Sequence, residues 1–187
     1  MTAEAPTLLP FRILIMGTPA AGKSWLARRI GSHFEIPCLE LDSAYFTSNW
    51  TPKLAEDWRA VVDQVLSTER WIIDGNHVDS ARSRMSRAQL LVVYDRHPLL
   101  CLMSYWLRIM RLMVVQVDEV PDYAKTADGR RRPAHMPLRF SGSIVRFRSR
   151  VVPKILELAS KEDLAVLVIR NRRQAQALTS NSFFSEP

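Results

Sequence analysis

Residues 12–24 read RILIMGTPAAGKS, and this stretch decides the fold. The apolar run Arg12–Met16 has the length and composition of a buried strand. Gly17 to Ser24 follow with the spacing Gly-x-x-x-x-Gly-Lys-Ser, and a helical pattern over 23–34 begins at once. A strand before and a helix after are the context in which this spacing forms a phosphate-binding loop. The stretch therefore predicts a nucleotide-binding α/β domain.

The residue types inside the loop suit the binding of phosphate. Gly17 and Gly22 let the backbone bend sharply and approach phosphate oxygens, and the first N–H groups of the next helix face the anion. Lys23 places a positive charge beside the β- and γ-phosphates, and the Ser24 hydroxyl is a candidate Mg²⁺ ligand. The predicted nucleotide-contacting residues of this region are Gly17, Thr18, Pro19, Ala20, Ala21, Gly22, Lys23, Ser24 and Trp25.

Four further apolar runs have the character of strands: CLEL (38–41), WIID (71–74), LLVVYD (90–95) and LAVLVIR (164–170). Helical patterns alternate with them over 54–68, 97–115 and 143–160, with a shorter one over 80–88. Continuous apolar runs are typical of strands covered on both faces, and the alternation favours right-handed parallel crossovers. We predict a three-layer, doubly wound, parallel five-stranded sheet, with the charged CLEL run at its edge.

Polar residues follow the ends of these strands, where ligands bind in such sheets. Asp42, Asp74 and Asp95 each follow a strand, so three acids converge on the edge that carries the phosphate loop. A single Asp after a strand is as often a helix cap or turn residue. Three acids beside a phosphate loop favour Mg²⁺ binding by at least one of them. Gly75-Asn76 and Arg170-Asn171 lie at the same edge.

Composition is that of one globular domain. The 187 residues are 47% hydrophobic and 24% charged, and the net charge of +7 suits polyanionic partners such as nucleotides or nucleic acid. Cys38 and Cys101, both in apolar company, predict buried free thiols in a reducing compartment. The start, MTAEAPTLLP, lacks the basic and apolar regions of a secretory signal. We therefore predict a cytoplasmic protein.

Residues 98–117 are long and apolar enough to suggest a membrane-spanning helix. Arg108 and Arg111 lie near the middle of this segment, where each costs about 2.5–3.5 kcal/mol on insertion scales. A mostly buried helix that holds both arginines towards a polar cleft is the favoured interpretation. No membrane partner is predicted.

The sequence resembles the nucleoside-monophosphate-kinase type of phosphate-loop protein, and more narrowly the adenylate-kinase-like proteins often labelled DNA topology modulation proteins. The resemblance covers residues 12–178 and depends on GTPAAGKSWLARRI, LELDSAYFTSNWTP, ERWIIDGNH, LLVVYDRHP and FRSRVVPKIL. It implies ATP and Mg²⁺ as cofactors and Asp74 as the acidic residue beside the metal, with Ser24. It also implies that Arg108, Arg146 and Arg150 gather around the transferring phosphate.

Elementary chemistry agrees with this use of arginine, because phosphoryl transfer requires positioning and charge neutralisation. Arg146 and Arg150 are four residues apart and share a helical face; the alternative is a solvated basic face. Adenylate kinases proper follow the strand-three Asp-Gly with Phe-Pro-Arg, whereas this chain has 76–78 as Asn-His-Val. AMP is therefore a disfavoured acceptor. A lone loop histidine such as His77 is more often incidental than functional.

We predict a single domain over residues 1–187 that contains three special segments. These are an acceptor-side helical segment over about 43–69, a lid over about 116–142 and a flexible tail over about 179–187. The lid sequence contains DGRRRP and lacks the paired cysteines of a zinc site. The residues predicted to contact the acceptor are Asp42, Tyr45, Trp50, Gly75 and Asn76.

Competing functions remain. The favoured one is ATP-dependent phosphoryl transfer to a nucleotide or small metabolite. The alternative is a nucleic-acid-associated ATPase or a regulatory ATP-binding protein, because residues 129–156 hold eight basic residues and no acid. Phe140 and Phe147 are too few for a stacking platform, however, and a lid that closes on phosphates needs the same arginines.

A signalling GTPase is disfavoured, because 170–173 read Arg-Asn-Arg-Arg where a guanine-reading Asn-Lys-x-Asp would stand. Arg170 and Asn171 are instead predicted to border an adenine. The identity of the acceptor and the oligomeric state are left open by the sequence.

Overall fold

The computed structural model describes residues 11–114 and 137–179. Its main sheet has five parallel strands in the order β2-β5-β1-β6-β7. These strands are β1 (Arg12–Gly17), β2 (Cys38–Glu40), β5 (Trp71–Asp74), β6 (Leu90–Tyr94) and β7 (Ala165–Ile169). The predicted doubly wound sheet is confirmed, with the CLEL strand at an edge. The strand that leads into the phosphate loop, β1, lies at the centre.

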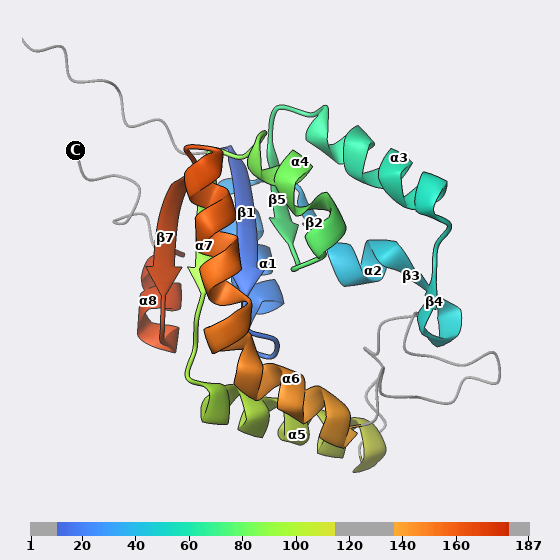
Figure 1. Ribbon diagram of the computed structural model, residues 1–187, viewed down its shortest axis with the longest axis vertical. Helices are drawn as coiled ribbons and strands as arrows, with labels where there is room; N and C mark the ends of the chain where they lie inside the picture. The colour runs from blue at the N-terminus through green and yellow to red at the C-terminus, as the bar shows by residue number, and fades with distance from the viewer. Residues whose placement is uncertain (1–10, 115–136, 180–187) are drawn as a thin grey trace, which may run out of the picture.

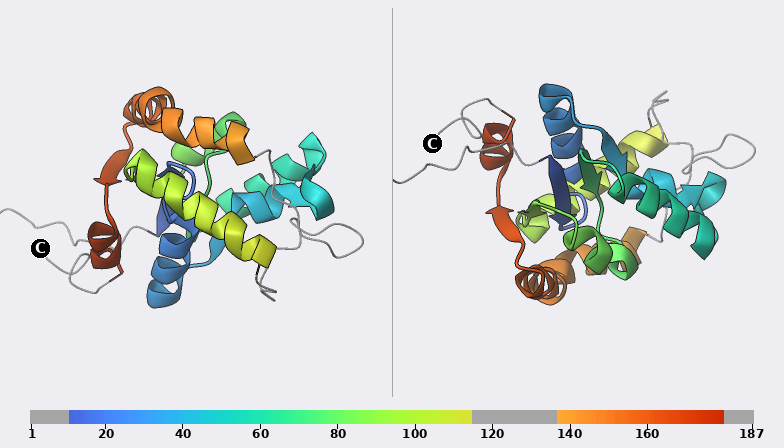
Figure 2. Two further views of the ribbon diagram at one scale, coloured as in Figure 1. Left: turned by 90° about the horizontal axis from the view of Figure 1, so that it is seen from below. Right: turned by 90° about the horizontal axis from the view of Figure 1, so that it is seen from above.

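Helices cover both faces of the sheet (Figures 1 and 2). They are α1 (Lys23–Phe34) and α8 (Arg172–Ala177) on one face, and α3 (Ala55–Leu66), α4 (Ala81–Met85) and α7 (Val152–Lys161) on the other. Successive side chains of β1 explain the three layers, because they alternate between faces. Leu14 and Met16 belong to the apolar cluster that includes Trp58 of α3. Ile13 belongs to the cluster that includes Leu26 of α1.

Two packed helices, α5 (Pro98–Val114) and α6 (Pro137–Arg150), lie beyond the carboxyl ends of the strands (Figure 1). The rings of Tyr105 and Phe140 join them, with 5.1 Å between centroids. Cys101 and Ile109 are buried beneath α5, but its outer side is exposed, so the expectation of a mostly buried helix is only half met. None of the described helices is long and apolar enough to cross a membrane.

Short elements follow β2 and β5 at the carboxyl ends of these strands. After β2 come α2 (Leu41–Tyr45), β3 (Phe46–Thr47), the 3-10 turn η1 (Ser48–Trp50) and β4 (Thr51–Pro52). Strands β3 and β4 pair in antiparallel fashion as a small hairpin. A second 3-10 turn, η2 (Val78–Ser80), connects β5 to α4. The segment over about 43–69, predicted to lie on the acceptor side, thus contains most of α2, the β3–β4 hairpin and α3.

Two predictions about this chain are wrong. The single helix predicted over 143–160 is two helices, because the chain breaks at Val151 and α7 begins with Pro153 in its first turn, where proline is tolerated. Cys38 is exposed, not buried, because β2 is an edge strand; Cys101 is buried, and both thiols are free. The predicted lid and tail fall largely outside the described residues, although the lid's last residues form the start of α6.

Candidate nucleotide-binding site

The phosphate loop connects β1 to α1 and has the backbone that its glycines predict. Gly17 has a φ of +129°, and a Cβ there would lie 2.4 Å from the Tyr94 carbonyl oxygen, so no side chain fits. Gly22 precedes α1 with a φ of +108° and gives the helix no side-chain cap. Uncapped N–H groups at a helix start attract anions. The loop therefore presents donors and leaves them available for phosphate.

Lys23 stands at the first position of α1, and its Nζ donates to the Thr18 carbonyl at 3.1 Å. Burial lowers the pKa of Lys23, and the nearby carboxylates of Asp74 and Asp42 partly offset this. The Thr18 side chain is fully buried, and its hydroxyl has no hydrogen-bond partner within the described part of the chain. Ala20 adopts a φ of +60° and Ala21 is buried, which completes the tight turn.

Ser24 and Asp74 meet beside the loop: the Ser24 hydroxyl donates to Asp74 Oδ2 at 2.5 Å. Asp74 is 5% exposed, and its other oxygen, Oδ1, has no hydrogen-bond partner among the described residues. Burial raises the pKa of Asp74, opposed by the Lys23 charge and the Ser24 hydroxyl. A hydroxyl and a buried carboxylate with a spare oxygen are the hard-oxygen donors that Mg²⁺ takes.

Ser24 and Asp74 are enough protein ligands for a magnesium site in which nucleotide phosphates supply further ligands. The described part of the chain contains no group of three or more His, Cys, Asp or Glu side chains able to hold a metal. Mg²⁺ in nucleotide sites is usually held by one or two protein groups, with phosphates and water supplying the rest. The donor set of Ser24 and Asp74 therefore fits Mg²⁺ together with a nucleotide.

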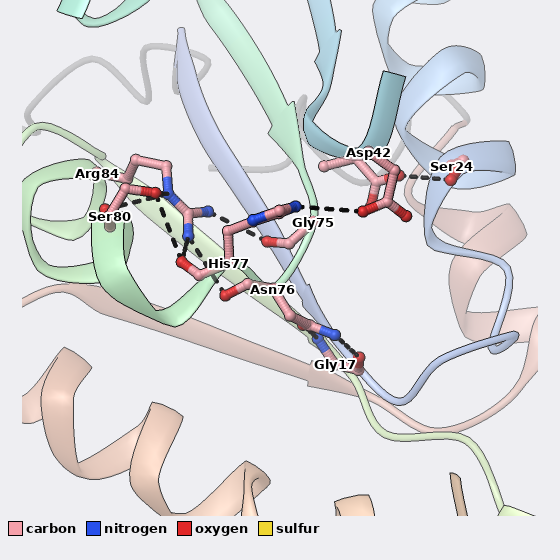
Figure 3. A network of polar contacts seen from close by, with 9 residues as sticks. Gly17, Ser24, Asp42, Gly75, Asn76, His77, Ser80 and Arg84 are labelled. Carbon is pink, nitrogen blue, oxygen red and sulfur yellow. Dashed lines mark hydrogen bonds and ion pairs between the residues drawn. The ribbon is translucent and has the colours of Figure 1, made fainter. Parts of the chain in front are cut away.

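Asn76 fixes the loop from the neighbouring strand. Its side-chain Oδ1 accepts from Gly17 N–H, and its Nδ2 donates to the Gly17 carbonyl, each at 2.9 Å (Figure 3). The Gly75 N–H in turn donates to the Ile15 carbonyl at 3.1 Å. Gly75 has a φ of +138°, and a Cβ would lie 2.8 Å from Leu41. The segment after β5 thus continues the sheet's pairing as far as the phosphate loop.

Arg84 holds that segment from beneath. Its guanidinium is fully buried and donates to the carbonyls of Gly75 (3.1 Å), Asn76 (3.3 Å) and His77, and to Ser80. Burial lowers the pKa of Arg84 to about 10, so the group stays charged at neutral pH. Sequence reasoning missed this residue, because nothing local distinguishes it from the exposed arginines beside it.

After β2, the Asp42 carboxylate lies 3.3 Å from His77 Nε2. This hydrogen bond, together with the charges of Lys23 and Arg108, lowers the pKa of Asp42. The His77 ring contacts Tyr45 and Trp58, with centroid distances of 4.6 and 5.1 Å. The His77 ring, which sequence reasoning treated as incidental, is therefore oriented by three neighbours, Asp42, Tyr45 and Trp58.

The other predicted acceptor-side aromatic, Trp50, lies further along the hairpin. Its ring contacts Phe46 at 5.3 Å, and Phe46 contacts Tyr45 at 4.8 Å. Asp42 itself keeps most of its side chain exposed, at 64%. The structure thus brings Asp42, Tyr45 and His77 together, with Trp50 connected to them through Phe46.

The predicted arginines take different positions. Arg108 of α5 is exposed, and its charge helps to lower the pKa of Asp42. Arg146 and Arg150 are exposed on α6. The arginine of α6 that reaches the carboxyl end of β6 is Arg148, whose Nε lies 3.1 Å from Oδ2 of the buried Asp95. The second oxygen of Asp95 has no partner in the described structure.

The remaining predicted residues lie beside α8. The Asn171 side chain caps this helix by accepting from Gln174 N–H at 2.9 Å, and Arg170 is exposed. The Arg172 guanidinium stands 5.6 Å from the centre of the half-buried Trp25 ring. Trp25 and Arg170–Arg172 therefore lie on one side of the phosphate loop, and Asp42 and His77 on the other.

Two solved structures align with this chain over nearly its whole length. One, a shikimate kinase from Bacteroides thetaiotaomicron, has 15% sequence identity and a TM-score of 0.53, and the alignment covers 91% of this chain and 95% of that one. The other, a shikimate kinase from Acinetobacter baumannii in complex with shikimate, has 17% identity and a TM-score of 0.53, with 92% of each chain covered.

The fold is that of a P-loop kinase. The order of the five parallel strands and the loop after the central strand agree with this assignment. Sequence identities of 15–17% establish the fold and not the substrate. No protein-family model matches the chain, and no curated protein does so.

Proposed function

We propose that this chain is an ATP- and Mg²⁺-dependent phosphotransferase whose acceptor is a nucleotide or a small hydroxyl-bearing metabolite. The observation that carries the proposal is the contact between Ser24 and Asp74 inside the phosphate loop, with Lys23 beside it. A buried carboxylate oxygen without a partner is unfavourable unless a cation or a proton satisfies it. A magnesium–nucleotide complex supplies that cation at the point where the loop holds phosphate.

On the donor side, Lys23 and the first N–H groups of α1 bind the β- and γ-phosphates. Ser24 and Asp74 hold Mg²⁺, which neutralises charge on the phosphates when it is bound. Asn76 keeps the Gly17 backbone in place through its paired hydrogen bonds. Trp25, together with Arg170 and Asn171, borders the adenine.

On the acceptor side, Asp42 accepts the hydrogen bond of the acceptor's hydroxyl and orients its oxygen towards the γ-phosphate. Its lowered pKa keeps it ionised at neutral pH, and His77 keeps the carboxylate in position. Tyr45 and Trp50 supply aromatic surface, and the Gly75 backbone forms the floor. The chain has no arginine at the Phe-Pro-Arg position of adenylate kinases, so AMP is not the proposed acceptor.

Arginines stabilise the charge that develops on the transferring phosphoryl group. Arg108 approaches from α5, close enough to Asp42 to influence its pKa. Arg146 and Arg150 are proposed to approach from α6. Arg148 is a third candidate on this helix, because its contact with Asp95 already brings it to the edge of the sheet.

The test is a coupled assay of ADP release from ATP and Mg²⁺, with panels of nucleosides, nucleoside monophosphates and small hydroxylated metabolites, shikimate included. Acceptor-dependent turnover that disappears in Lys23→Ala supports the proposal. The matched control is Lys161→Ala, which removes an exposed lysine that pairs with Glu157. ADP release that no acceptor stimulates, or that Lys23→Ala leaves unchanged, contradicts it.

The nucleic-acid alternative has one observation in its favour. Arg139, Arg146 and Arg150 are all exposed on α6, a helix without an acidic residue. If this row follows a phosphate backbone, Arg146→Ala should weaken DNA or RNA binding and reduce its salt slope by about one. If it serves the transferring phosphate, the same change should lower turnover by about 10²-fold. Measuring both quantities on one variant separates the two functions.

A further inference from the structure

Helix α5 carries an apolar stripe on the side turned away from the core. The stripe consists of Leu99, Leu100, Met103, Leu107 and Met110, which are 65, 42, 56, 52 and 55% exposed. Four of these residues recur every three or four positions and so share one helical face. Cys101 and Ile109 are buried, which places the core on the opposite face. A continuous exposed apolar face of this kind marks an interaction site.

Among the described residues, this face of α5 is exposed. Seen from below, α5 crosses the front of the molecule, with α1 on one side and α6 on the other (Figure 2, left). The half-buried Trp106 borders the stripe and contacts Tyr105, with 6.1 Å between ring centroids. The apolar surface therefore extends along one outer edge of the domain.

Charge identifies the partner. The two packed helices α5 and α6 hold six arginines and no acidic residue, and the whole chain has a net charge of +7. Arg111 follows Leu107 by four residues and borders the stripe. A second copy of this chain would bring like charges together, which disfavours self-association. Nucleic acid is bound by basic residues with aromatic stacking, whereas the stripe consists of leucine and methionine.

We propose that α5 docks this protein on an anionic lipid surface. The stripe enters the boundary between headgroups and acyl chains, and Arg111, which borders the stripe, contacts the phosphate groups of the lipids. A helix with an apolar face and basic flanks lies in the plane of the interface in this way. Tryptophan is enriched at the same depth. The proposal concerns a surface contact and no span, and it does not depend on the kinase activity.

The experiment measures sedimentation of the full chain with vesicles of phosphatidylcholine alone and with about one third phosphatidylserine. We expect binding to the anionic vesicles only, with a blue shift of tryptophan emission that Trp106→Phe removes. The triple variant Met103→Gln/Leu107→Gln/Met110→Gln should weaken binding by about ten-fold or more. Arg111→Gln should weaken it by about five-fold.

Matched controls lie elsewhere on the molecule. Leu54→Gln changes a leucine that is 75% exposed at the start of α3. Arg87→Gln removes an exposed arginine just after α4, at the opposite end of the molecule from α5 in Figure 1. Both variants should bind anionic vesicles as the unaltered chain does.

Several outcomes would overturn the proposal. The first is absence of binding to anionic vesicles, or equal binding by the triple variant. A dimer that the triple variant abolishes would make a second copy the partner. Salt-sensitive DNA binding that requires Arg111 but not the stripe would point to nucleic acid. The last outcome is that the unaltered chain does not bind vesicles and the triple variant has a much lower melting temperature. Other residues of the same chain would then cover the stripe.

Discussion

Arg84 offers the sharpest test of how this site is held together. Replacing it with methionine keeps much of the volume and removes every donor of the guanidinium. The carbonyls of Gly75, Asn76 and His77 then lose this donor, although the Ser80 hydroxyl still donates to the His77 carbonyl at 3.5 Å. Only the Gly75 contact is fully buried, so water can replace the guanidinium at the other two. We expect a loss of stability together with a loosened phosphate loop.

The magnitude follows from these contacts. An unsatisfied buried carbonyl costs about 1–3 kcal/mol, and hydrogen bonds to a charged group contribute about 1.5–3 kcal/mol. Against this, Arg84→Met no longer keeps a charge in the interior, which offsets part of the loss. We expect Arg84→Met to lower the free energy of unfolding by about 2–4 kcal/mol. For a domain of this size, the melting temperature then falls by about 5–15 °C.

Urea unfolding of Arg84→Met and of Arg82→Met checks this expectation. Arg82 is two residues away, and its exposed side chain pairs with Glu162, so its loss should change stability by about 0.5 kcal/mol or less. Nucleotide affinity should fall in Arg84→Met and also in Asn76→Ala, which removes the contacts with Gly17. Equal stability of the two arginine variants, or unchanged affinity in Arg84→Met, would refute the reasoning.

Three further predictions concern the charged groups of the site. Lys23→Ala should abolish turnover with little change in melting temperature, measured by calorimetry beside Lys161→Ala. The raised pKa of Asp74 means that the native state binds more protons than the unfolded state between the ordinary and the raised value, so stability falls as pH rises through that window. Asp74→Asn should abolish this fall and Mg²⁺-dependent turnover together; persistence of either argues against the assignment. Arg148→Ala should free the Asp95 carboxylate and destabilise the protein more than Arg146→Ala, measured by urea unfolding.

The sequence predicts those parts of the fold that depend on local patterns. Each apolar run became a strand within a residue or two, and the charged CLEL run became the edge strand. The break between α6 and α7 had a local signal that periodicity alone overlooks, namely Pro153, a residue suited to the first turn of a helix and not to its interior. The exposure of Cys38 required knowledge of what covers β2, which no local pattern contains.

The candidate site likewise contains some residues that local patterns predict and others that they do not. The phosphate loop and the Ser24–Asp74 pair follow from a motif and from the rule that parallel strands end at one edge. Arg84 and His77 gain their roles from partners that β5 and α2 bring to them, so their surroundings in the sequence contain no comparable signal. Which of the three acids lies beside the loop serine also depends on tertiary contacts. Asp42 pairs with His77, Asp95 pairs with Arg148, and Asp74 pairs with Ser24.

The arginines of α6 show what helical spacing can and cannot predict about the direction of a side chain. A spacing of four places Arg146 and Arg150 on one face, but it does not say which way that face points. The apolar residues do: Phe140, Ile144 and Phe147 recur at helical spacing, and Ile144 is fully buried. Because Arg148 follows Ile144 by four residues, it lies beside this buried face, where it contacts Asp95. The positions of the buried apolar residues of α6, and not the spacing of its arginines, determine which arginine reaches the sheet.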